Sequence, residues 1–266
     1  MKRSYDEVHG RREADKSYLP ISIDMILGFR DNYWKPRNLS LRQLTVITAM
    51  LFGYSTLSRK SEYLINPPNS DFPNLLANDI SFTIQVDGVE VIVPSFQLAS
   101  IPLSEVTGCH IIIRKAKNDP HGKGHKYIFP RRPVVRGVRL YDITTTLWEY
   151  VVRVRPASGH LFFFVAAEDW VLCPNYFNEQ LKLLANFYKF DSKRVSSHSL
   201  RVGGASALMA AGVPEYLIKE MGGWRSLAFL LYLRATVQSF SDAQDVLTNA
   251  DLFSVEKVRA MHMAFG

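Results

Sequence analysis

A histidine and an arginine three residues apart are the feature of this sequence that points most directly to chemistry. His198 and Arg201 lie in the stretch SHSLRVGGA, for which Ser196 or Ser197 can serve as the N-cap of a helix. Residues three apart share one face of a helix, and the free backbone N–H groups of a first helical turn attract anions. An imidazole and a guanidinium that point together from such a helix start suit a phosphate group.

Three further segments give this pair a context. Gly222-Gly223-Trp224 follows downstream, and Tyr232 lies eight residues after the tryptophan. Upstream, Arg59 opens the stretch Arg-Lys-Ser-Glu at the end of an apolar helical segment. Each of these side chains taken alone is more often a surface charge, a capping group or a core residue. The functional interpretation therefore depends on their ordered combination.

The segment from Arg114 to Arg139 is strongly basic. It contains nine lysines and arginines and one acidic residue, Asp119, in a chain whose net charge is +7, so the rest of the chain is close to neutral. Such a segment is either a solvated basic face or a surface that follows a phosphate backbone. The second interpretation predicts a set of DNA-contacting residues: Arg114, Lys115, Lys123, Lys126, Arg131 and Arg132.

The apolar spacing predicts a mostly helical chain. Ser40 and Gln43 form a capping box before a run of apolar residues at helical spacing that reaches Tyr54. Later helices are expected around 147–154, 177–187, 196–211 and 214–222, and from Ser226 to about Val237.

Alternating apolar residues in the first half predict a small antiparallel sheet. Two such runs, 82–86 and 89–93, flank Asp87-Gly88, a typical two-residue hairpin turn. Further strands are expected at 110–113 and 127–129. The predicted fold class is therefore α+β and mainly α, with a disordered tail over 1–17, one domain over 18–250 and a C-terminal tail or helix over 251–266.

Composition excludes several classes of protein. Hydrophobic residues make up 47% of the 266 residues, which is enough for a core, and no apolar run approaches the ~18 residues of a membrane span. The N-terminus lacks the apolar region of a secretory signal. Two cysteines, Cys109 and Cys173, are too few for a disulfide framework, which favours an intracellular setting.

Metal and nucleotide sites are not expected either. His110, His121 and His125 lie near a cysteine, but two of them surround a glycine-rich turn and no second cysteine is close. Lys123 lies between two glycines but lacks the first glycine and the following Ser or Thr of a phosphate-binding P-loop. We therefore predict no metal and no cofactor.

In this set of residues the sequence resembles the tyrosine recombinases, the phage-integrase-like enzymes. Their pattern is an Arg followed by x-Ser-Glu, a hairpin Lys, His-x-x-Arg at a helix start, Gly followed by His or Trp, and then a Tyr. Every element has a counterpart here in the same order, over roughly residues 18–245. The amino-acid sequence of residues 221–234, MGGWRSLAFLLYLR, is most similar to recombinases of eukaryotic mobile elements.

The resemblance implies a fold, a reaction and a set of roles. The fold would be a tyrosine-recombinase-like catalytic domain, and the reaction would cut and rejoin DNA through a 3′-phosphotyrosine. Arg59 and Arg201 would bind the phosphate, His198 would assist proton transfer, and Tyr232 would be the nucleophile. Trp224 would donate its N–H to the phosphate. A hairpin lysine, Lys117 in preference to Lys123, would protonate the leaving 5′-hydroxyl.

The resemblance also implies partners and leaves alternatives. The partner would be double-stranded DNA, bound by a homotetramer on paired sites and by a monomer when free, in the nucleus if the host is eukaryotic. Only 58 residues precede Arg59, so we expect a catalytic domain without the usual clamping domain, either a natural short form or a truncated copy. The alternatives are an inactive DNA-binding relic of a mobile element and a type IB topoisomerase-like enzyme.

Overall fold

The computed structural model of the protein describes residues 18–34, 39–115, 124–132 and 141–224, and about half of these described residues are helical when 3-10 and π turns are included. The helices are α2 (Ile23–Phe29), α3 (Leu41–Thr56), α4 (Lys60–Tyr63), α5 (Ile143–Val154), α6 (Pro174–Phe187), α7 (Ser197–Ala210) and α8 (Glu215–Met221). The strands are β1 (Ile80–Val86), β2 (Val89–Pro94), β3 (Val106–Ile113), β4 (His125–Pro130), β5 (Phe164–Val165) and β6 (Trp170–Val171).

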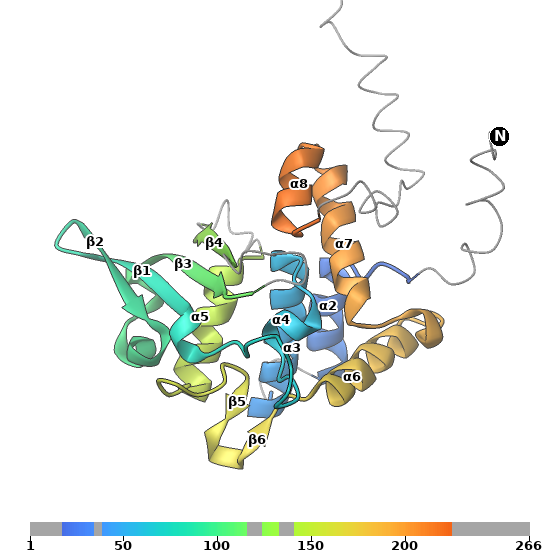
Figure 1. Ribbon diagram of the computed structural model, residues 1–266, viewed down its shortest axis with the longest axis horizontal. Coiled ribbons are helices and arrows are strands. Elements are labelled where there is room, and N and C mark those ends of the chain that lie inside the picture. The colour runs from blue at the N-terminus through green and yellow to red at the C-terminus, as the bar shows by residue number, and fades with distance from the viewer. Residues whose placement is uncertain (1–17, 35–38, 116–123, 133–140, 225–266) are drawn as a thin grey trace, which may run out of the picture.

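Helix α3 is the centre of the fold, with α5 and the main sheet on one side and α2 and α7 on the other (Figure 1). The predicted capping box is present: the Ser40 hydroxyl accepts from the Gln43 N–H at 3.2 Å, and the Gln43 side chain accepts from the Ser40 N–H at 3.0 Å. Every residue from Leu44 to Gly53 is buried. Because α3 is packed on all sides, its C-terminal end is held firmly, and this end leads into the turn that carries Arg59.

The main sheet is antiparallel with strand order β2-β1-β3-β4. The expected turn is present at Asp87-Gly88, where both residues have positive φ (52° and 79°), as a two-residue hairpin with the native strand twist requires. Helix α5 packs against the sheet, and its Thr144 hydroxyl donates to the carbonyl of Phe129 on β4 at 2.9 Å. The Asp142 carboxylate caps α5 by accepting from the N–H groups of its first turn.

Helix α7 packs on the rest of the domain through two glycines. A Cβ atom on Gly203 would lie 1.8 Å from the carbonyl oxygen of Ile21, and one on Gly204 would lie 2.4 Å from that of Tyr54 at the end of α3. The backbones are close enough for Ile21 N–H to bond the carbonyl of Ser199 at 3.1 Å. Only residues without a side chain permit this approach, which explains the Gly-Gly pair that follows Arg201.

The predicted fold class is confirmed, a mainly helical α+β domain with a small antiparallel sheet. Strand β3 begins four residues before the predicted strand. The elements that were not predicted include α2, α4, the short 3-10 turns between β2 and β3, and the β5–β6 pair. The helix predicted from Ser226 to Val237 and both predicted tails lie outside the described residues. Among the helices described here, none has the length and apolar character that a membrane crossing requires.

Candidate catalytic site

Arg59 is positioned by the turn between α3 and α4. Helix α3 ends at Leu57, a buried residue in the left-handed conformation (φ 52°), and Arg59 is the N-cap of α4. The carboxylate of Glu62 accepts from the Arg59 N–H at 2.7 Å and from its guanidinium Nη1 at 3.0 Å. Glu62 is nearly buried whereas Arg59 keeps 23% of its side chain exposed, so the carboxylate anchors a guanidinium that still reaches solvent.

His198 and Arg201 lie in the first turns of α7, as the sequence predicts. Of the two possible caps, Ser196 is the one used, and its hydroxyl accepts from the His198 N–H at 3.2 Å. His198 is half-buried, with its ring edge-on to that of Tyr18. Arg201 is 1% exposed, and its Nη2 donates to the carbonyl of Gly222 at 3.0 Å.

The Gly222–Trp224 turn after α8 holds the guanidinium of Arg201 from two directions. Besides the Gly222 carbonyl, the ring of Trp224 lies 4.6 Å from the guanidinium carbon, a cation–π contact. A Cβ on Gly222 would overlap the Trp224 ring, which folds back over the turn. Gly223 has φ +61°, a conformation that glycine adopts without strain. The Gly-Gly-Trp sequence is thus what the turn around Arg201 requires.

Strand β4 supplies two residues that the sequence analysis did not assign to the site. The Tyr127 hydroxyl donates to the Met221 carbonyl at 2.8 Å, and a Cβ on Gly223 would lie 2.9 Å from Nε2 of His125. His125, Tyr127 and Phe129 alternate with more exposed residues along β4. The sequence did not reveal this inward face, because the exposed Ile128 between Tyr127 and Phe129 is itself apolar.

The charges of the site act on one another. Burial, followed by the positive charges of Arg201 and Arg59, lowers the pKa of His198 from 6.5 to about 4. Its imidazole is therefore neutral at pH 7 and able to accept a proton. Burial raises the pKa of Tyr127 to about 12, against the opposing effects of the Ser58 hydroxyl and, to a smaller extent, of the same two arginines. Arg59, His198, Arg201 and Trp224 thus form one cluster built from α4, α7 and the turn after α8.

The candidate DNA-contacting residues do not all have the same surroundings. Arg114 forms an ion pair with Asp79 at 2.7 Å and donates to the carbonyl of Asn74, and Arg131 donates to the carbonyl of Leu103 at 2.7 Å. These two guanidiniums have structural partners, which limits their availability to DNA.

The remaining candidates differ again. Lys115 lies 6.0 Å from the ring centre of Phe72. Lys126 is exposed on β4, and Arg132 is exposed two residues after the end of this strand. Lys117, Lys123 and Tyr232 lie outside the described residues, so their predicted roles stay predictions.

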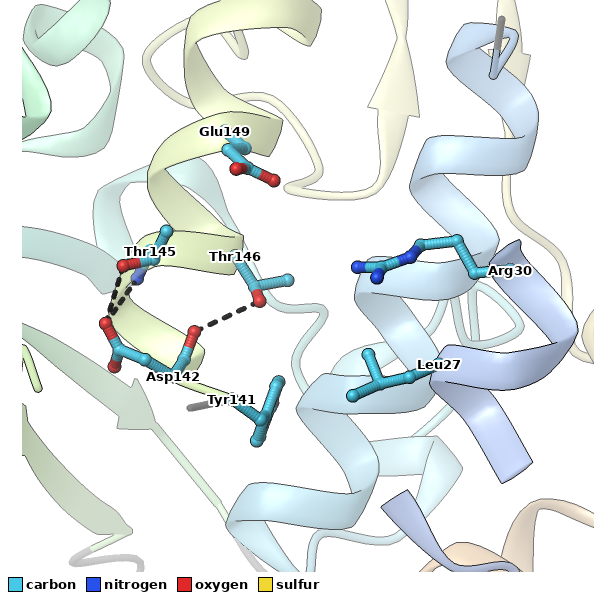
Figure 2. A pocket seen from close by; sticks show the side chains of 7 residues that line it. All are labelled: Leu27, Arg30, Tyr141, Asp142, Thr145, Thr146 and Glu149. Atoms are coloured by element: carbon cyan, nitrogen blue, oxygen red, sulfur yellow. Dashed lines mark hydrogen bonds between the residues drawn. The ribbon is translucent and has the colours of Figure 1, made fainter. Parts of the chain in front are cut away.

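Two cavities lie near this part of the fold. The smaller, about 110 Å³, lies between α2 and the start of α5, and Figure 2 shows Arg30 facing Thr146 and Glu149 across it. Its Asp142 carboxylate is engaged in capping α5, and none of the clustered site residues lines it.

The larger cavity, about 320 Å³, is lined by Tyr54, Phe129, Leu208 and Met221 among others. None of Arg59, His198, Arg201 and Trp224 lines it, and Met221 is its link to the turn around Arg201. Within the described part of the chain, no three His, Cys, Asp or Glu side chains gather as a metal site would need.

Comparison with known proteins identifies the fold of this chain among known folds. No protein-family model matches the sequence, and no curated protein sequence matches it. The crystal structure of the XerH site-specific recombinase bound to palindromic difH substrate, a post-cleavage complex, matches with a TM-score of 0.52 at 14% identity over 88% of this chain. The chain has the fold of a tyrosine recombinase catalytic domain.

This chain spans about half of the XerH recombinase, 54% of its length. Two further matches are more distant. The crystal structure of XerA recombinase has a TM-score of 0.46 at 14% identity, with 88% of this chain and 66% of that chain covered. The Tn1549 transposon integrase in complex with circular intermediate DNA has a TM-score of 0.42 at 14% identity, with 85% and 64% covered.

Proposed function

We propose that this chain cuts and rejoins DNA strands through a covalent 3′-phosphotyrosine intermediate, as a site-specific recombinase or integrase of a mobile element. The observation that carries the proposal is the convergence of Arg59, His198 and Arg201, which come from distant parts of the sequence. Two guanidiniums beside a neutral imidazole make a site for a phosphodiester, and the fold is that of a recombinase catalytic domain.

The reaction assigns a step to each group. The phenol oxygen of Tyr232 attacks phosphorus, and its proton passes to the imidazole of His198. A bond forms between the phenol oxygen and phosphorus as the bond to the 5′-oxygen breaks, and Lys117 gives the leaving oxygen a proton. The 5′-hydroxyl of a DNA end reverses these steps when strands rejoin.

The arginines supply the electrostatic part of catalysis. Negative charge builds up on the non-bridging oxygens in the five-coordinate transition state, and preorganised donors stabilise it most where water is excluded. Arg201 fits this role because it is buried and held by the Gly222 carbonyl and the Trp224 ring. Arg59, which reaches solvent, suits first contact with the DNA backbone.

Covalent trapping tests the proposal. The protein is incubated with nicked duplexes of randomised sequence, and adducts that survive denaturation are isolated and their DNA sequenced. We expect adducts with the wild type and with Tyr216→Phe, a matched control on the exposed face of α8, and none with Tyr232→Phe. Adducts that persist in Tyr232→Phe would assign the nucleophile elsewhere.

Other outcomes separate the alternatives. DNA binding without any wild-type adduct would contradict catalysis and favour a DNA-binding relic. Relaxation of supercoiled plasmids irrespective of sequence would favour a topoisomerase-like activity.

The same assay identifies the general acid. A 5′-bridging phosphorothioate creates a leaving group that needs no proton, so it restores cleavage to a variant that lacks only the acid. We expect rescue of Lys117→Ala. Rescue of Lys123→Ala alone would reverse the assignment.

A further inference from the structure

The turn that holds Arg201 is itself held by strand β4. In this turn the Met221 carbonyl accepts from the Tyr127 hydroxyl at 2.8 Å, and the next carbonyl, that of Gly222, accepts from Arg201 at 3.0 Å. Two residues later the Trp224 ring covers the guanidinium. A single hydrogen bond from β4 therefore fixes the peptide unit next to the one that orients Arg201.

His125 provides a second contact between β4 and the same turn. Its Nε2 lies 2.9 Å from the position that a Cβ on Gly223 would occupy, so the imidazole is packed against the backbone of the turn. His125 and Tyr127 face the same side of β4, with ring centres 6.2 Å apart. The strand thus contacts the turn on both sides of Gly222.

We infer that Tyr127 is a positioning residue, whose hydroxyl holds the Met221–Trp224 turn and through it sets the orientation of the Arg201 guanidinium. This inference rests on the proposed function only in taking a phosphate as what Arg201 orients toward. The positive charges of Arg201 and Arg59 act on the Tyr127 phenol and oppose the rise of its pKa. At neutral pH the phenol keeps the proton that it donates to Met221, as an ordinary tyrosine does, and burial raises its pKa further, to about 12.

Tyr150 offers a matched control for removing the Tyr127 hydroxyl. Its own hydroxyl also donates to a backbone carbonyl, that of Phe162, at 2.9 Å, and it lies buried on α5. Tyr127→Phe and Tyr150→Phe delete the same atom and the same type of hydrogen bond. A merely structural role predicts the same consequences for both variants.

The first measurement does not depend on catalysis. The protein is labelled with 5-fluorotryptophan, and the ¹⁹F signal of Trp224 is assigned by its disappearance in Trp224→Phe. We expect Tyr127→Phe to shift or broaden this signal and Tyr150→Phe to leave it unchanged, with comparable decreases in melting temperature. An unchanged Trp224 signal in Tyr127→Phe would overturn the inference.

The second measurement is the single-turnover rate of adduct formation on a duplex selected by covalent trapping. A misplaced catalytic group costs up to about a hundredfold in rate, so we expect Tyr127→Phe to be roughly ten- to a hundredfold slower at unchanged DNA affinity. In an Arg201→Lys background the further loss from Tyr127→Phe should vanish, because the hydroxyl acts through Arg201. Equal losses in both backgrounds, or an equal loss in Tyr150→Phe, would overturn the inference.

The two measurements can refute the proposed function and the positioning role of Tyr127 independently of each other. If the wild type forms no adduct on any duplex, the proposed function fails, and the ¹⁹F signal alone decides whether Tyr127 positions the turn. If adducts form but Trp224 does not respond to Tyr127→Phe, the function stands and the positioning role is wrong.

Discussion

His198 should make the stability of this protein fall steeply in mild acid. Burial and the neighbouring arginines lower its pKa from 6.5 to about 4, so the folded protein resists protonation of an imidazole that the unfolded chain protonates readily. The unfolded state therefore binds more protons as the pH falls through 6.5 towards 4, and stability is lost in that window. Between about pH 7.5 and about pH 5 the two pKa values correspond to a loss of up to about 2 kcal/mol.

The assay compares the wild type with His198→Gln, whose side chain stays neutral at both pH values. Urea unfolding followed by circular dichroism gives the free energy of unfolding at each pH. We expect the wild type to lose up to about 2 kcal/mol more than the variant on acidification. In parallel, NMR of ¹³C-labelled histidine reports the midpoint directly, which should lie near 4 and should rise in Arg59→Gln as one of the two positive neighbours disappears.

Equal acid sensitivity in the wild type and in His198→Gln would refute this reasoning, as would an NMR midpoint near 6.5. A DNA duplex adds a further check, because a bound phosphate offsets the arginine charges. Its presence should raise the midpoint of His198.

Three other perturbations test the architecture of the site. Gly203→Ala should destabilise the fold by several kcal/mol, although alanine favours helices by ~1 kcal/mol, because the new Cβ would meet the Ile21 carbonyl; thermal unfolding measures the sign. Gly223→Ala should cost about 1–2 kcal/mol for its φ of +61° alone, and Gly223→Asn should melt at a higher temperature than Gly223→Ala. Lys126→Gln combined with Arg132→Gln should reduce the slope of log DNA affinity against log salt by roughly two, and an unchanged slope would make these ordinary surface charges.

The local elements were predictable where short-range chemistry fixes them. The Ser40–Gln43 capping box and the Asp87-Gly88 turn are encoded within four residues, and both are present in the structure. Helix α2 was not predicted, because its seven residues are too few for a helical periodicity to be recognised.

For the candidate site, the sequence named four residues that the structure brings together, Arg59, His198, Arg201 and Trp224, but not the residues that support them. Arg59, His198 and Arg201 follow one another along the chain in the order of the recombinase pattern, and this order can be read directly from the sequence. The hydrogen bond of Tyr127 was not accessible to prediction, because its partner is the backbone carbonyl of Met221, far along the chain, and any residue type supplies such a carbonyl. The ion pair of Arg114 with Asp79 was missed for a related reason, since it depends on the packing of β3 against the segment before β1.

The close backbone contact between α7 and the segment near Ile21 has a consequence for biosynthesis. The Ile21 N–H bonds the carbonyl of Ser199, and the arginines of the site come from opposite halves of the chain. Contacts between such distant residues form late, because the loop between them must first be closed. A ribosome-bound chain that has not yet exposed α7 therefore holds Arg59 without Arg201. The cluster of Arg59, His198 and Arg201 is completed only after the greater part of the domain has been synthesised, so under the proposed function a partial translation product would lack half of its phosphate-binding groups.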